Sequence, residues 1–201
     1  HLVTPIPGVI RPAIAAMIPN LNGPDSVILD VGLNPDARPD VMYQYGILGS
    51  IYSRLVESVA DPRVGLLNIG EEPEKGNLVA KSTYQLMVDT TEFNFIGNVE
   101  ANMLFVETPA DVLVCDGFVG NILLKQAEAF YRLVSRKKEA NGYFEMFNFE
   151  NFGGTPLLGV KAPLVIGHGI SNDKAIKNMI LQTERVVRSR MVEQIMDQMK
   201  R

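Results

Sequence analysis

The chain has 201 residues, of which 46% are hydrophobic, and this length and composition suit one globular domain with a sizeable core. Its 19 lysines and arginines against 23 aspartates and glutamates give a formal net charge of −4, which argues against a protein that binds nucleic-acid phosphates. The single cysteine, Cys115, excludes an internal disulfide and a thiolate zinc cluster and fits a reducing compartment. No apolar run approaches the about 20 residues that span a bilayer, so we expect a cytoplasmic protein.

Alternating strand and helix patterns predict an α/β fold. Short apolar runs bounded by turn residues indicate strands, and apolar residues at helical spacing indicate helices. In chain order, the expected elements are strands at 11–18 and 27–31, a helix at 39–59, a strand at 64–69, a helix at about 78–88, strands at 93–96 and 111–115, a helix from 119 to about 139, a strand at 163–167 and a long helix from 172. This order predicts a mainly parallel, Rossmann-like sheet covered on both faces, in a single three-layer domain over residues 1–201.

Residues 138–152 interrupt this rhythm and are expected to form an aromatic helical insertion. The segment carries six large hydrophobic side chains, Tyr143, Phe144, Met146, Phe147, Phe149 and Phe152. They suit contact with an acyl chain or a membrane surface, or packing against a second subunit. The glycine-rich stretch at 153–159 predicts a loop.

Residues 112–125 are the most informative part of the chain. Their apolar run breaks at Asp116 and Gly117 and resumes with helical spacing, which predicts a buried strand, a tight turn and a helix. The N–H groups of a helix start attract anions. Asn121 and Lys125, four residues apart, share one face of this helix, so we expect an anion site to which Lys125 adds positive charge.

Polar residues follow five of the expected strands, at the sheet edge where open parallel sheets bind ligands. Ordinary turn formation and helix capping are the alternative explanation for each of them. His168 suits a general base or an oxyanion donor, or a structural role, whereas Cys115 should be buried and unreactive. The candidate substrate-binding residues are Asp30, Asn34, Asn68, Glu71, Lys75, Glu100, Asp116, Gly117, Gly120 and Ser171, beside the candidate catalytic residues Asn121, Lys125 and His168.

Five motifs together resemble the bacterial phosphate acyltransferase of phospholipid synthesis, the acyl-acyl-carrier-protein:phosphate transacylase family. They are NIGEEPEKGN at 68–77, FIGNVE at 95–100, DVLVCDGFVGN at 111–121, GGTPLLG at 153–159 and HGISN at 168–172. The resemblance runs in order over nearly the whole chain. It departs from the family pattern at Leu33, which stands where the family has alanine. The family's amino-terminal glycine-rich strand and serine-alanine-glycine-asparagine-threonine-glycine segment are also absent.

This resemblance implies a fold similar to that of isocitrate and isopropylmalate dehydrogenases, and a homodimer. It implies that a long-chain acyl group passes from acyl carrier protein to inorganic phosphate, giving acyl phosphate and free carrier, with no cofactor and no metal. Peripheral membrane contact is a further expectation, because the product is lipid-like.

Two other classes of function stay open at this point. One is a dehydrogenase, or a short-chain acyl or acetyl transferase of related architecture. The other is a non-catalytic fragment that dimerises or binds carrier protein, because the chain matches only the carboxy-terminal two thirds of the family pattern.

Overall fold

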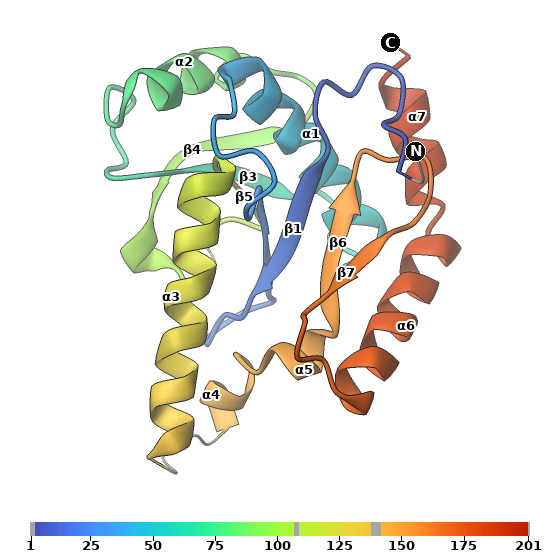
Figure 1. Ribbon diagram of the computed structural model, residues 1–201. Coiled ribbons are helices and arrows are strands. Elements are labelled where there is room, and N and C mark those ends of the chain that lie inside the picture. The colour runs from blue at the N-terminus through green and yellow to red at the C-terminus, as the bar shows by residue number, and fades with distance from the viewer. Residues whose placement is uncertain (1–2, 107–108, 138–141, 201) are drawn as a thin grey trace.

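The computed structural model describes residues 3–106, 109–137 and 142–200, without the side chains of Tyr143 and Phe149. It contains a seven-stranded sheet in the order β4-β3-β5-β2-β1-β6-β7 (Figure 1). The strands are β1 (Ala13–Ile18), β2 (Ser26–Leu29), β3 (Arg63–Asn68), β4 (Asn94–Glu100), β5 (Val112–Val114), β6 (Gly154–Leu158) and β7 (Val165–Gly167).

The sheet is parallel on one side and antiparallel on the other. Strands β4, β3, β5 and β2 pair in parallel, and helices connect them, as the alternating sequence pattern predicts. Strand β1 pairs antiparallel with both β2 and β6, and β6 pairs antiparallel with β7. A short turn joins β1 to β2 and another joins β6 to β7, and such short connections can join only antiparallel strands. The prediction of a mainly parallel sheet is therefore correct for strand direction, with β1 and β7 as the exceptions.

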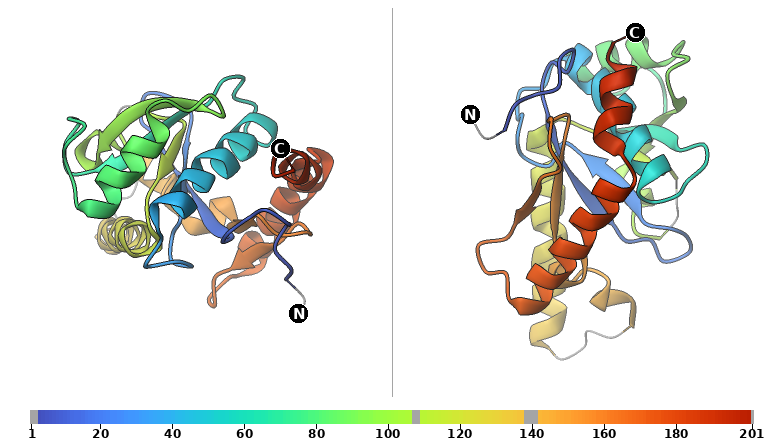
Figure 2. Two further views of the ribbon diagram at one scale, coloured as in Figure 1. Left: turned by 90° about the horizontal axis from the view of Figure 1, so that it is seen from above. Right: turned by 90° about the vertical axis from the view of Figure 1, so that its right-hand side faces the viewer.

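Helices cover the two faces of the sheet unequally (Figures 1 and 2). One face packs against α1 (Pro39–Leu55), with α2 (Leu78–Met87), α6 (Asp173–Arg188) and α7 (Met191–Gln198) beside it. The other face packs against α3 (Gly117–Arg136). The remaining helices are the 3-10 turn η1 (Ala101–Met103) and the short helices α4 (Gly142–Glu145) and α5 (Phe149–Phe152).

Side-chain alternation along the strands divides the core in two. Val27, Leu29, Val112 and Val114 join the large core under α1, whereas the residues between them join the small core under α3. Gly49 lets α1 approach the sheet closely, because a Cβ there would lie 2.4 Å from a methyl carbon of Val112. The small core takes only partly buried residues from α3, which leaves space on that face beside β1.

Two segments differ from the sequence prediction. The stretch expected as a loop at 153–159 contains β6, because burial of Leu157 and Leu158 against β1 outweighs the local glycine and proline signals. The long terminal helix is two helices, since Arg190 takes a left-handed conformation with φ of 54° between them. The aromatic insertion contains the short helices α4 and α5, and the prediction for 138–141 lies outside the described residues.

In the part of the chain that the structure describes, no helix is both long enough and apolar enough to cross a membrane.

Asp111 ties the start of β5 to β3. Its carboxylate, only 8% exposed, accepts hydrogen bonds from the Arg63 backbone nitrogen at 2.8 Å and from the Arg63 guanidinium at 3.0 and 3.1 Å. We predict that Asp111→Asn lowers the free energy of unfolding by about 2 kcal/mol, because it weakens charge-assisted bonds in a buried position. Urea denaturation of both proteins measures this loss.

The matched control is Asp197→Asn, which removes an exposed pair with Lys200 in which both side chains are more than half accessible. Its expected effect is below about 0.5 kcal/mol. Equal losses in the two variants would contradict a structural role for the Asp111 carboxylate.

Candidate functional site

A cavity of about 250 Å³ lies on the α3 side of the sheet, between α3, β1 and the β6–β7 hairpin. Its floor is apolar and comes mainly from β1, α3 and α5. Polar groups stand on α3 and at the ends of β6 and β7. The residues that line it are Ile14, Ala16, Met17, Ile18, Pro19, Val31, Phe105, Asn121, Leu124, Lys125, Ala127, Glu128, Phe147, Phe152, Gly153, Gly154, Thr155, Ile166, Gly167 and His168.

The fold brings the three candidate catalytic residues to this one cavity. Asn121 and Lys125 reach it from successive turns of α3, and His168 reaches it from the end of β7, more than forty positions later in the chain. The Asn121 side-chain nitrogen donates to the Val31 carbonyl at 3.3 Å, which orients the amide at the cavity wall. An apolar space with convergent polar groups at its margin is the usual form of a small-molecule site.

Lys125 lies in an ion pair with Glu128, a cavity residue that the sequence analysis did not select. The Lys125 ammonium lies 3.1 and 3.0 Å from the two Glu128 carboxylate oxygens. The Glu128 side chain is only 18% exposed, and Arg132 approaches it to 3.5 Å from the next turn. The i, i+3 and i+4 spacings of these charges were visible in the sequence. An anion that binds Lys125 therefore competes with a carboxylate already in place.

His168 is exposed and makes hydrogen bonds with the backbone that follows it. Its Nδ1 accepts a long hydrogen bond from the Ile170 backbone nitrogen at 3.4 Å, and its carbonyl accepts one from the Ser171 nitrogen at 2.9 Å. In a neutral imidazole this arrangement leaves the proton on Nε2, which is then the donor. The Ser171 hydroxyl oxygen is buried without a hydrogen-bond partner among the described residues.

The candidate residues that follow β2 and β5 are Asp30, Asn34 and Asp116, and they hold the chain segments next to the cavity. Asp30 is fully buried and accepts from the backbone nitrogens of Ile14, Leu33 and Asn34, and Asn34 also donates from its side chain to Asp30 and to the Pro12 carbonyl. Asp116 caps α3 by accepting from the Val119 nitrogen at 2.8 Å. None of these three residues lines the cavity, and their proposed contact with substrate stays a prediction.

Gly117 and Gly120 allow α3 to begin directly against the Asp30 turn. A Cβ on Gly117 would lie 2.8 Å from a carboxylate oxygen of Asp30, and one on Gly120 only 2.0 Å from the Asp30 carbonyl oxygen. Neither position can take a side chain unless the helix moves.

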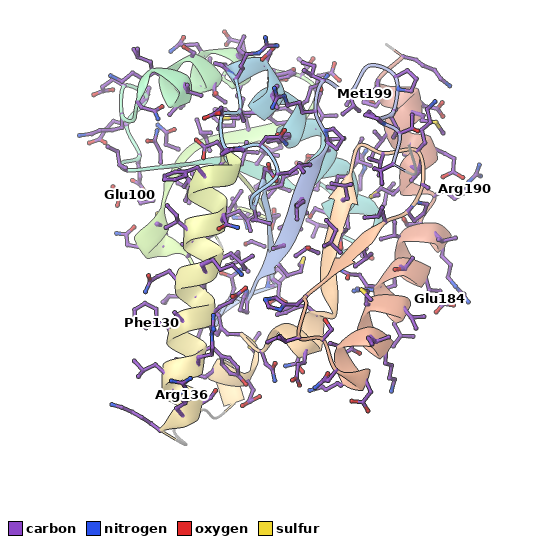
Figure 3. The ribbon with its side chains drawn as sticks, in the orientation of Figure 1. Glu100, Phe130, Arg136, Glu184, Arg190 and Met199 are labelled. Carbon is purple, nitrogen blue, oxygen red and sulfur yellow. The ribbon has the colours of Figure 1, made fainter. Side chains whose placement is uncertain are left out.

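The candidates that follow β3 and β4 gather elsewhere on the sheet edge. Asn68 donates to the Lys75 carbonyl at 3.1 Å and to Asn98 at 3.0 Å, and Lys75 lies 3.9 Å from Glu72. Glu71 is exposed in the same loop. Glu100 lies at the end of β4, on the far side of α3 from the β6–β7 hairpin (Figure 3). The structure does not bring Asn68, Glu71, Lys75 or Glu100 to the cavity.

Cys115 is unsuited to nucleophilic chemistry. The thiol is 2% exposed and donates weakly to the Asp30 carbonyl at 3.5 Å. Burial first, and then the nearby Asp116 and Asp30 charges, raise the pKa of Cys115 well above its usual value, so the thiol stays protonated at neutral pH. Among the described residues, no group of three or more histidine, cysteine or acidic side chains could hold a metal ion.

Solved structures with the same mixed α/β fold confirm the architecture, a mostly parallel sheet between helices. A branched-chain phosphotransacylase from Enterococcus faecalis V583 matches 88% of this chain and 65% of its own with a TM-score of 0.60, at 16% identity. A phosphotransacetylase from Streptococcus pyogenes matches 92% of this chain and 57% of its own with a TM-score of 0.57, also at 16% identity. At this identity the likeness defines the fold class.

The chain belongs to the fatty acid synthesis protein family, whose pattern matches residues 1–136. It is 41% identical to the phosphate acyltransferase of Desulfitobacterium hafniense over 98% of this chain and 64% of that protein. It is 38% identical to the phosphate acyltransferase of Bacillus subtilis over 99% of this chain and 65% of that protein. The resemblance drawn from the five motifs is thereby confirmed, and the chain spans slightly less than two thirds of the length of these relatives.

We predict that Gly120→Ala displaces the start of α3, and with it Asn121 and Lys125. The expected loss in the free energy of unfolding is about 1–3 kcal/mol, because the new methyl group has no space beside the Asp30 carbonyl. Thermal or urea denaturation measures the loss.

Gly169→Ala serves as the control, because a Cβ at Gly169 would meet nothing within 4 Å. Equal stability of Gly120→Ala and the unchanged chain would show that α3 does not depend on this close approach.

Proposed function

We propose that this chain carries the acyl-transfer site of an acyl-acyl-carrier-protein:phosphate acyltransferase. In the proposed reaction a long-chain acyl group moves from the carrier thioester to inorganic phosphate. The observation that carries the proposal is the meeting of Asn121, Lys125 and His168 around one largely apolar cavity. Membership of a family with curated phosphate acyltransferases supports it.

The cavity has two parts whose chemistry suits the two substrates. The apolar floor, which includes Ile14, Leu124 and Phe152, suits the acyl carbons next to the thioester. At the rim, the Lys125 ammonium and the Asn121 amide suit a phosphate oxygen. The Nε2 proton of His168 suits donation to the thioester carbonyl as its oxygen gains negative charge.

The proposed reaction needs positioning more than activation. A phosphate oxygen, already anionic at neutral pH, attacks the thioester carbon and forms the new C–O bond. The resulting oxyanion accepts a hydrogen bond from His168, and the C–S bond then breaks with both its electrons on sulfur. The carrier thiolate takes a proton from solvent. No side chain of the protein becomes covalently bonded to the substrate, which agrees with the inert environment of Cys115.

Four finer expectations belong to the same proposal. The fold is of the isocitrate and isopropylmalate dehydrogenase kind, residues 1–201 act as one domain, the protein works in the cytoplasm, and two copies form a homodimer. Exposed apolar side chains on α3, among them Phe118, Ile122 and Phe130, supply a surface suited to such pairing.

We predict that Lys125→Ala raises the phosphate KM by about tenfold or more, because the loss of one charge-assisted contact costs over about 1.4 kcal/mol. The assay measures phosphate-dependent release of the free thiol from long-chain acyl carrier protein. It compares the 201-residue chain with a version extended to the length of the relatives. Lys125→Arg should retain part of the affinity, since it keeps the charge.

Lys137→Ala is the control, because Lys137 follows the last turn of the same helix and does not line the cavity. An unchanged phosphate KM in Lys125→Ala would remove Lys125 from the site. Activity in the extended version alone would assign part of the site to the remaining third of the protein. No activity in either version would contradict the proposed function.

We also propose that the aromatic insertion meets the membrane surface, where a lipid-like product leaves the enzyme. Phe144 is 39% exposed on α4, whereas Phe147 packs against Phe105 at 5.2 Å between ring centroids and lines the cavity. Phe144→Asp should therefore reduce flotation with anionic phospholipid vesicles several-fold, because a charge resists transfer to the interface.

Leu86→Asp on α2 is the control, since Leu86 is 48% exposed on a different helix. Flotation that Phe144→Asp leaves unchanged would favour packing against a second subunit as the role of the insertion.

A further inference from the structure

The pairing between β1 and β6 stops partway along both strands. They pair only at residues 13–14 and 157–158, although β1 continues to Ile18 and β6 already begins at Gly154. The same register would place Gly154 opposite Met17. Figure 1 shows the two strands diverging from their paired ends. A gap in the sheet therefore lies beside the last residues of β1.

The residues of β6 explain this gap. Pro156 is the next residue in register and has no N–H group with which to continue the ladder. A Cβ on Gly153 would lie 2.3 Å from the Met179 backbone nitrogen of α6. A Cβ on Gly154 would lie 2.7 Å from the Ile166 carbonyl oxygen of β7. These close approaches hold the start of β6 against α6 and β7 rather than against β1.

The backbone of Met17 faces the gap. Val27, which lies opposite Met17 on β2, donates its N–H to the Asp111 carbonyl on the other side of β2, at 2.9 Å. Residues opposite each other in an antiparallel ladder alternate between bonded and non-bonded pairs, and this pair is non-bonded, so the Met17 N–H and C=O point towards β6. No described residue pairs with Met17 across the gap.

The gap lies next to the proposed acyl-transfer site. Met17 and Gly154 both line its cavity, and Gly154 pairs with Gly167, directly before His168. A second cavity, of about 440 Å³, lies on the other side of β1 between α5 and α6, and Met17 and Phe152 line both cavities. The free edge of β1 is therefore accessible beside the proposed oxyanion donor.

A free strand edge binds extended chains that carry amide groups, because their amides replace those of the missing strand. The donor in the proposed reaction is the thioester of acyl carrier protein, whose sulfur ends a pantetheine arm, a narrow chain with two amides. Resting on that proposed function, we propose that the free edge of β1 binds the pantetheine arm of the donor. One arm carbonyl accepts from the Met17 N–H, one arm N–H donates to the Met17 carbonyl, and the sulfur lies towards His168.

An NMR titration of the 201-residue chain with pantetheine tests the proposal. We expect the Met17 amide proton to show the largest downfield shift among the amides of β1, because it gains a hydrogen bond. The Ala16 amide, which points towards β2, is the internal control. A thiol of triethylene glycol, similar in length but without amides, should bind at least about tenfold more weakly. No measurable binding of pantetheine, equal affinity for the two thiols or an unmoved Met17 amide would overturn the proposal.

Pro156→Ala tests the gap itself. The variant supplies the missing N–H, so the ladder can extend towards Met17 and close the free edge. We expect pantetheine affinity to fall by about fivefold or more. Pro163→Ala is the matched control, because Pro163 is an exposed proline between β6 and β7, outside both cavities, and its replacement should change the affinity by less than about twofold. Unchanged affinity in Pro156→Ala, with its new amide protected from exchange, would contradict the proposal. The titration of the unchanged chain decides if the ladder does not close.

The same arm occurs on coenzyme A, and titration with each carrier distinguishes the two sources. We expect acyl carrier protein with its arm to move the Met17 amide at lower concentration than coenzyme A does. A shift with coenzyme A alone would keep the arm site and assign it to another thioester, and a shift with neither would overturn it. A Met17 shift without phosphate-dependent thiol release would contradict only the proposed function. Release without the shift would contradict only the arm site.

Discussion

The buried carboxylate of Asp30 is the constraint on which the site depends. Its oxygens accept from the backbone of β1 at Ile14 and from the Leu33 and Asn34 nitrogens of the following turn, while its own backbone pairs with Cys115 at the end of β5. These hydrogen bonds replace the water that the buried carboxylate has lost, and they hold three chain segments together. Because the first turn of α3 packs directly on this turn, the same carboxylate sets where Asn121 and Lys125 lie.

The unequal covering of the two faces explains where the cavities occur. Helix α1 buries nearly all of its length against the parallel strands and leaves no room there. Beside β1 the covering is thinner, because α3 packs next to β2 on one face and α6 packs against β6 and β7 on the other (Figure 2). Met17 and Phe152 line both cavities, so one strand and one short helix separate two spaces of different chemistry. The first is mainly apolar, and the second has a larger polar share in its lining.

Most of the strands and helices could be predicted from the sequence, because each has a regular spacing of apolar residues and clear turn or capping residues at its ends. Asn77, Asp116 and Asn172 cap helices where the turn residues indicated starts. The hairpin strand β6 was missed because its local residues favour a loop and only contact with β1 makes it a strand. The grouping of Asn121, Lys125 and His168 followed from the resemblance and the strand-end rule, whereas the separate placement of Asn68 and Lys75 depends on strand order, which no local pattern encodes. The cavity on the other side of β1 could not be predicted from the sequence, because its residues Asp25, Glu57 and Gln182 come from a turn, a helix end and a distant helix.

The Lys125–Glu128 pair changes how phosphate recognition at the site should be understood. A bare lysine would bind any anion, whereas here the ammonium already contacts both oxygens of a largely buried carboxylate. A monoanion can offer Lys125 no more charge than Glu128 does, so it gains little by displacing that contact. In the proposed function phosphate, of which about half is dianionic near neutral pH, would offer more charge and several acceptors, and it would also use the Asn121 amide on the turn before. If phosphate binds as proposed, the resident carboxylate would set a threshold that favours phosphate over weaker anions.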